Sequence, residues 1–266
     1  MYGRQHGKSQ RAIEFLEAAR ERGVDITADQ YPYKAGSTML ASFLPPWTRT
    51  GDVDDTLDHL RNENDRDRIH THLADVTVPW EDVSVTSVAS EENERFVGMS
   101  IEAIALERGT DPESVVMDLL AEERLEVEEV SFHSIEPDVR NILEYERAAV
   151  ATDGLLGGEP HPRTYGTYPR VLGTYARDEN LFSVEEAVRM MTSLPARIMG
   201  LSEKGIIRPG ADADLVAFDP DTVSTSATYE EPRHTPDGIP HVLVNGTFVV
   251  EQGEHTGATP GTVLRK

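Results

Sequence analysis

The sequence predicts an α/β fold that is followed by a smaller all-β part. Three observations support this prediction. A helical pattern over residues 9–23 is followed by an apolar strand over 24–28, which ends in the polar and aromatic loop 29–33. A second apolar strand covers 148–152 and also ends in a polar loop. From about residue 204 onward, short strands and turns replace the helical patterns.

The first helix is predicted from its ends and its apolar stripe. Ser9 suits the N-cap and Gly23 suits the position beyond the C-terminus. Apolar residues recur between them at helical spacing (Ala12, Ile13, Leu16 and Ala19). The strand that follows brings Asp29 and Tyr31 to its carboxyl end. Functional side chains gather at such strand ends in α/β folds.

A long excursion separates the two apolar strands. Residues 45–98 are charged and irregular in pattern. Helices are predicted after them over 100–109, from the cap at Asp111 and Pro112, and from Pro137. Because structureless connections of this length are uncommon in compact domains, the stretch of about 45–145 predicts an inserted lid or small subdomain.

The end of the α/β part and the start of the all-β part are marked by turn and cap residues. Residues 157–173 are predicted to form a Gly- and Pro-rich loop, and Ser183 and Glu186 a capping box for the next helix. A short helix is predicted from Pro195 to near Gly200. Strands are then expected at 214–218 and 241–244, with turns at 219–220 and 245–246. We therefore expect two parts, 1–203 and 204–266.

Composition excludes several classes of partner. The net charge of −23 repels nucleic acid and anionic membrane surfaces. The chain has neither an apolar run of membrane-spanning length nor a signal-peptide pattern, so a cytoplasmic protein is expected. Four of the 25 basic residues are Lys, and this acidic, Lys-poor composition favours a halophilic protein over an ordinary acidic one. Without Cys, disulfides and thiolate metal ligands are excluded within this chain.

Asp153 is the leading candidate for chemistry. It directly follows the apolar strand 148–152 and precedes Gly154, so its carboxylate should project from a strand end. There it can act as a general base on water or as a metal ligand. The alternative is an Asp that turns the chain before Gly, and position alone leaves both open. In the loop after it, Arg163 is suited to grip a carboxylate, or else to pair with this acidic surface.

Longer motifs give a specific resemblance. The run TDGLLGGEPHPRTYGTYPRVLG, followed by MTSLPARIMGL, resembles the N-acyl-D-amino-acid deacylase (D-aminoacylase) family of the amidohydrolase superfamily. The segment DITADQYPYKAGSTML (25–40) resembles the end of that family's seventh barrel strand. The segments 205–220 and 242–266 resemble its C-terminal β-sandwich. The similarity covers nearly the whole chain and is weakest over roughly 45–98.

The resemblance implies a fold and a reaction. The fold would be the C-terminal part of a metal-dependent (β/α)8 barrel, roughly strands seven and eight with an inserted lid, plus strands of a small β-sandwich. The reaction would be hydrolysis of the linear amide of an N-acyl-D-amino acid by zinc-activated water. By this match Asp153 is the general acid/base, Tyr31 and Ser37 contact the substrate, and Arg163 binds its carboxylate.

The family's metal ligands have no counterparts that we can assign in this sequence. They are an H-x-H after strand one, a bridging Cys, and His residues ending strands five and six, the last in an S-H-x-K motif. His70 and His72 form an H-x-H, but it follows a charged stretch and not an apolar strand. We therefore expect no metal ligand here, zinc only in the complete family enzyme, and little activity of this chain without an upstream chain that supplies the rest of the barrel.

Two other functions stay open at this point. One is a catalytically inactive remnant or a subunit of a split enzyme, which the missing ligands favour. The other is an amidohydrolase that acts on cyclic amides or dipeptides, against which the HPR-x-YGT run argues. An upstream reading frame with H-x-H and S-H-x-K motifs would favour a deacylase.

Overall fold

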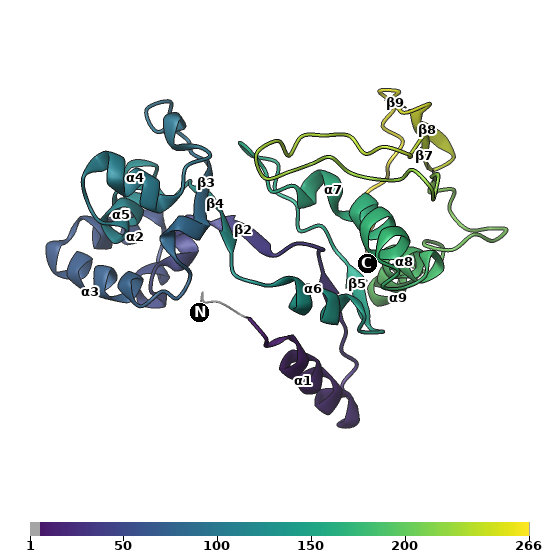
Figure 1. The fold of residues 1–266 in the computed structure, drawn as a ribbon, viewed down its shortest axis with the longest axis horizontal. Coiled ribbons are helices and arrows are strands. Elements are labelled where there is room, and N and C mark those ends of the chain that lie inside the picture. The colour runs from purple at the N-terminus through teal and green to yellow at the C-terminus, as the bar shows by residue number, and fades with distance from the viewer. Residues whose placement is uncertain (1–5, 266) are drawn as a thin grey trace.

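The computed structural model describes residues 6–265 and shows three groups of elements side by side (Figure 1). A lobe of helices with a small sheet lies on the left. Further helices lie near the middle, and helices with the C-terminal strands lie on the right. The arrangement is α/β, as the sequence predicts. Within the described residues, no helix is long and apolar enough to cross a membrane.

The middle group positions the strand ends. β1 (Ala28–Gln30) pairs in parallel with β5 (Ala148–Val150), so residues 118 or more apart in sequence end at the same edge. The predicted strand 24–28 is therefore wrong by about four residues, because the pairing starts only at Ala28. α1 (Ser9–Glu21) and α6 (Glu136–Leu143) pack against each other beside this pair.

The predicted N-cap of the first helix is also wrong. The residue before α1 is Lys8, and its side chain makes no capping hydrogen bond. Instead, the carboxylate of Asp138 in α6 accepts hydrogen bonds from the backbone N–H of Gly7 at 2.7 Å and of Ser9 at 3.1 Å. A carboxylate distant in sequence thus satisfies the free N–H groups of the helix start and ties α1 to α6.

The inserted lobe, residues 35–132, is built on a three-stranded antiparallel sheet of order β2-β4-β3. Its strands are β2 (Ala35–Met39), β3 (Val83–Ser87) and β4 (Glu128–Phe132). The helices α2 (Val53–Arg61), α3 (Glu63–Ala74), α4 (Ile101–Arg108) and α5 (Pro112–Glu122) complete it, with the short 3₁₀ turns η1 (Leu40–Phe43), η2 (Pro46–Arg49), η3 (Trp80–Asp82) and η4 (Glu94–Phe96). The predicted starts of α4, α5 and α6 are confirmed.

The predicted irregularity of residues 45–98 is wrong. Asp52 caps α2 in a capping box with Asp55. Leu57 and Leu60 in α2, and Ile69 and Leu73 in α3, are fully buried at helical spacing within their own helices. The apolar stripes are narrow, so the many charged residues on the outer faces of α2 and α3 hid the helical period in the sequence.

The right-hand group contains α7 (Arg163–Arg170), the π-helical η5 (Val171–Asp178), α8 (Val184–Met191) and α9 (Ser193–Met199). The loop predicted over 157–173 is therefore helical from Arg163 onward, despite Pro169 inside α7. Pro169 has no N–H to donate to the carbonyl four residues earlier, and the helix continues in π-helical turns after it. Helices at the predicted positions after Ser183 and around Pro195 are confirmed, and Ser183 caps α8.

The C-terminal strands form a four-stranded antiparallel sheet. Its order is β6 (Leu215–Ala217), β7 (His241–Val244), β8 (Thr247–Glu251) and β9 (Glu254–His255). The predicted turn at Asn245 and Gly246 joins β7 to β8, and both residues have positive φ, 48° and 74°. Positive φ at two adjacent residues is the signature of a type I′ hairpin turn.

Candidate functional site

Asp153 lies just beyond the parallel strand pair. The backbone N–H of Ala151 still donates to the carbonyl of Gln30 at 3.1 Å, and the strand pairing ends there. Asp153 has a φ of 47°, a left-handed conformation that is uncommon for a residue with a side chain. Its side chain is 68% exposed and points away from the strands. Strained backbone of this kind persists where the surroundings enforce it, often at functional sites.

Arg163 is the partner of Asp153. Its side chain is only 1% exposed, and its Nη2 lies 2.9 Å from Oδ2 of Asp153. The same Nη2 donates a hydrogen bond to the carbonyl of Ser37 at 3.0 Å. The guanidinium group stacks over the ring of Tyr31, with 4.5 Å between its central carbon and the ring centroid. Nε and Nη1 of this buried cation, which together carry three N–H bonds, have no hydrogen-bond partner among the described residues.

His161 fixes the position of Arg163. Its Nε2 is 3.0 Å from the carbonyl of Ala35, and its Nδ1 accepts a hydrogen bond from the backbone N–H of Arg163 at 2.9 Å. The two partners require a neutral ring that carries its proton on Nε2. Burial, and secondarily the charge of Arg163, lowers the pKa of His161 to about 3, which agrees with the neutral form. The ring packs between Tyr33 and Tyr229, with centroids 5.1 Å and 5.0 Å away.

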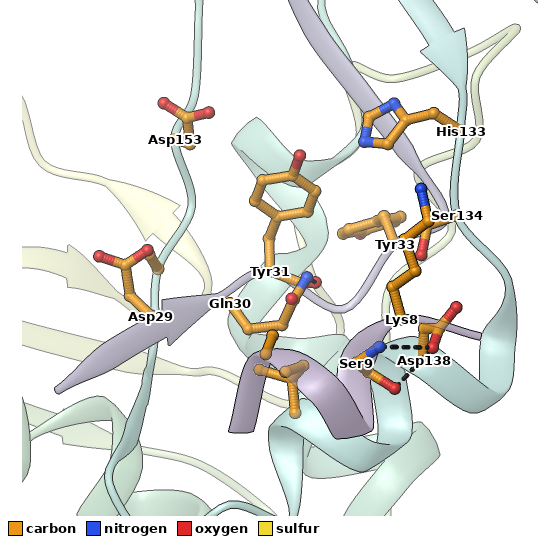
Figure 2. Close-up of a pocket in the computed structure, with 13 residues that line it drawn as sticks. Lys8, Ser9, Asp29, Gln30, Tyr31, Tyr33, His133, Ser134, Asp138 and Asp153 are labelled. Atoms are coloured by element: carbon orange, nitrogen blue, oxygen red, sulfur yellow. Dashed lines mark hydrogen bonds between the residues drawn. The ribbon is translucent and has the colours of Figure 1, made fainter. Parts of the chain in front are cut away.

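The four site residues proposed from the sequence line one cavity. Asp153, Arg163, Tyr31 and Ser37 surround a volume of about 330 Å³, at the lower end of the range for small-molecule pockets. A neighbouring cavity of about 600 Å³ shares Tyr31, His133 and Asp153 with it. In Figure 2 the ring of Tyr31 lies between Asp153 and His133, and its hydroxyl group points into the space between them.

Close packing keeps this space narrow at Gly36. A Cβ atom at Gly36 would lie 2.5 Å from Cε1 of His133 and 3.3 Å from the hydroxyl oxygen of Tyr31. Burial lowers the pKa of His133 and raises that of Tyr31, so both are neutral near pH 7. The wall opposite Asp153 therefore carries polar but uncharged donors and acceptors.

Sequence reasoning missed the buried acidic residue of this cavity. Glu129 in β4 lines it with a side chain that is 0% exposed. Burial raises the pKa of Glu129 to about 8, and Ser131 and the charge of Arg163 offset only part of that shift. The sequence analysis predicted no strand at 128–132, so nothing marked this Glu among 48 acidic residues.

The site does not gather a metal-ligand set within the part of the chain that the structure describes. Over residues 6–265, the one cluster of three suitable ligand atoms is His70, Asp111 and Glu113. It lies on the inserted lobe, where the imidazole Nε2 of His70 is 3.0 Å from Oδ1 of Asp111, and it includes none of the cavity residues. Asp153 alone does not make the three-ligand site that a hydrolytic zinc needs, so the cavity residues by themselves do not fit this metal.

Comparison with known proteins decides the family. Residues 8–250 match the sequence model described as "Amidohydrolase family". This chain belongs to the amidohydrolase family. It is 36% identical to a D-aminoacylase from Alcaligenes xylosoxydans xylosoxydans, over 98% of this chain and 46% of the relative. An N-acyl-D-glutamate deacylase from the same organism is 34% identical, over 98% of this chain and 45% of the relative.

Solved structures agree. A crystal structure of D-aminoacylase superimposes with a TM-score of 0.75 at 36% identity. The superposition covers 97% of this chain and 46% of the D-aminoacylase chain. The N-acyl-D-glutamate deacylase of Bordetella bronchiseptica, solved with zinc and a phosphonate mimic of the tetrahedral intermediate, gives a TM-score of 0.77 at 32% identity, covering 98% and 47%. The chain thus spans about half the length of the relatives it matches.

Proposed function

We propose that this chain supplies the acid/base and carboxylate-binding side of an N-acyl-D-amino-acid deacylase. The reaction is hydrolysis of a linear amide to a D-amino acid and a carboxylate. The observation that carries the proposal is the buried guanidinium of Arg163, which is held 2.9 Å from Asp153 and whose Nε and Nη1 make no hydrogen bond to any described residue. The match to D-aminoacylases over nearly the whole chain supports it.

Each cavity residue has a separate role in this proposal. Arg163 holds the substrate carboxylate through its free N–H groups, which suit a bidentate contact. The hydroxyl groups of Tyr31 and Ser37 orient the substrate. Asp153, at the exposed strand end, takes a proton from the attacking water and passes it to the departing amide nitrogen. His161 keeps the Arg163 backbone in place without contacting the substrate.

The metal of such an enzyme would come with ligands from outside the described residues. Zinc activates water in hydrolases by lowering its pKa. We propose that the rest of the barrel, in the same or an upstream chain, provides those ligands. Accordingly, 1–203 would form roughly strands seven and eight of a (β/α)8 barrel with the insertion at about 45–145, and 204–266 would form part of a β-sandwich. Residues 1–5 and 266 lie outside the described residues.

A complementation experiment tests this function. The part of a relative D-aminoacylase that this chain does not match is fused to it, and release of D-amino acid from N-acetyl-D-amino acids is measured with zinc present. We expect hydrolysis by the fusion but not by either part. A fusion that is folded and zinc-loaded yet inactive on every N-acetyl-D-amino acid contradicts the proposal and favours an inactive remnant.

A second candidate function has one observation in its favour. A D-hydantoinase from Rhizobium radiobacter is 31% identical over 102 residues, which is 34% of this chain. Hydrolysis of a cyclic amide such as a hydantoin by the same fusion, with no activity on linear N-acetyl-D-amino acids, would favour that function instead.

A further inference from the structure

Glu129 is buried in the cavity, where the side chain of Ser131 and the charge of Arg163 favour its ionised form. It lies in β4 between Thr38 of β2 and Val85 of β3, in the middle of the three-stranded sheet. Neither carboxylate oxygen has a hydrogen-bond partner among the described residues. Buried carboxylates in proteins are almost always hydrogen-bonded or paired with a cation, so this one requires an explanation.

Arg163 does not explain the burial of the Glu129 carboxyl group. The charge of Arg163 acts on Glu129, but its Nη2 is engaged by Asp153 and by the carbonyl of Ser37. The other titratable groups on the cavity wall, Tyr31 and His133, have pKa shifts that keep them neutral. The cavity wall therefore carries both a buried guanidinium group and a buried carboxyl group, each with polar atoms that make no hydrogen bond to a described residue.

We propose that Glu129 selects N-acyl-D-amino acids whose side chain carries a cation, such as a lysine-like ammonium or an arginine-like guanidinium group. This inference rests on the proposed function. The substrate carboxylate binds Arg163. As the substrate's cationic side chain enters, the carboxyl proton of Glu129 leaves to solvent, and the cation donates to the oxygens of the carboxylate that forms. Such charge-assisted hydrogen bonds in a buried site are among the strongest that proteins make.

Substrate comparison in the active, zinc-loaded fusion tests the selection. N-acetyl-D-lysine is compared with N-acetyl-D-norleucine, which has the same four-carbon side chain without the ammonium group, and with N-acetyl-D-glutamate. We expect kcat/KM to favour the lysine derivative over the norleucine derivative by roughly tenfold to a hundredfold, since a hydrogen bond to a charged group contributes that much. The glutamate derivative should be the poorest substrate.

Glu129→Gln removes the charge and keeps the shape. We expect it to abolish the preference for the lysine derivative over the norleucine derivative, because the variant lacks the charge that the ammonium group would contact. Glu126→Gln, at an exposed position just before the same strand, is the matched control and should leave this preference unchanged. Glu129→Asp keeps the charge and should retain part of the preference.

The outcomes separate the two proposals. If no N-acetyl-D-amino acid is hydrolysed, the proposed function fails and the inference fails with it. Only the inference fails if kcat/KM for N-acetyl-D-norleucine or N-acetyl-D-glutamate equals or exceeds that for the lysine derivative. The same holds if Glu129→Gln leaves the preference for the lysine derivative intact. That last result would indicate that another segment of the complete protein provides the partner of Glu129.

Discussion

The inserted lobe and the parallel strand pair are built in different ways. The lobe has a closed core of 20 buried apolar residues, all between Leu40 and Val127. By contrast, α1 beside the strand pair has no buried residue, and Phe15 on it is 64% exposed. The sheet of β1 and β5 has only two strands among the described residues. The lobe buries its own apolar surface in this core. The strand pair and α1 expose apolar surface and strand edges that further strands and helices normally cover.

The cavity lies at the junction of these two regions. Tyr31 and Asp153 come from the ends of the strand pair, and Ser37 and Glu129 from the sheet of the lobe. Arg163 contacts both, through Asp153 and through the carbonyl of Ser37. A self-sufficient lobe can therefore hold its wall of the cavity firmly, while the wall that carries Asp153, the proposed acid/base, depends on the neighbours of β1 and β5.

Asp153→Asn should have the largest effect, because it removes the proton acceptor at the strand end. We expect kcat of the complemented enzyme to fall by about a thousandfold, within the range for loss of a general acid/base. The far-UV circular dichroism spectrum should not change, since the side chain is exposed. Asp67→Asn on the outer face of α3 is the control. Retention of a tenth or more of the activity would remove Asp153 from the mechanism.

Leu120→Ala should have the next largest effect and tests the lobe as a unit. Leu120 on α5 is fully buried in the lobe core, so its truncation leaves a cavity. We expect a loss of about 2–5 kcal/mol in the free energy of unfolding of the lobe, measured by urea denaturation. An excised fragment spanning 35–132 should fold by itself and show the same loss. A fragment that is unfolded would show that the lobe needs the strand pair.

Glu129→Gln should make stability independent of pH in a defined range. The pKa of Glu129 rises from 4.5 to about 8 on folding, so the folded state keeps a proton that the unfolded state loses between these values. The free energy of unfolding of the native chain should therefore fall as pH rises from about 5 to 8, by roughly 3–4 kcal/mol. The variant should lack this decline. An identical decline in both proteins would mean that Glu129 does not titrate as described.

Phe15→Ala should have the smallest effect. Because this side chain on α1 is mostly exposed, we expect the melting temperature of the isolated chain to shift by less than about 1 °C, as for ordinary surface substitutions. In the complemented protein the same substitution should be clearly destabilising if other elements cover α1. Equal effects in both proteins would show that α1 faces solvent in each.

Local signals explain which elements the sequence predicts. Caps and prolines located α4, α5 and α6, because Ser100, Asp111 and Pro137 act within one helical turn. α7 was missed because Gly166 and Pro169 are typical of loops, and only its packing and the π turns after it keep it helical. The β2-β4-β3 sheet was missed because its strands are brought together across the whole lobe.

The site residues divide in the same way, into those with a local signal in the sequence and those whose role depends on contacts distant in the chain. Asp153 was found from its place after an apolar strand, and Arg163, Tyr31 and Ser37 from longer motifs; the structure brings all four to one cavity. The positioning role of His161 and the burial of Glu129 depend on contacts to Ala35 and on the sheet around β4, which are distant in sequence. No local pattern distinguishes such residues.

Zinc content tests most directly the claim that this chain holds the acid/base side of the site without the metal ligands. The chain is refolded in molar KCl, which screens its net charge of −23, loaded with zinc and dialysed. His70→Ala removes the exposed cluster on the lobe as a source of bound metal. We predict less than about a tenth of an equivalent of zinc per chain, because three protein ligands are needed for tight binding. A full, tightly held equivalent in His70→Ala that is lost in Asp153→Asn would contradict the account.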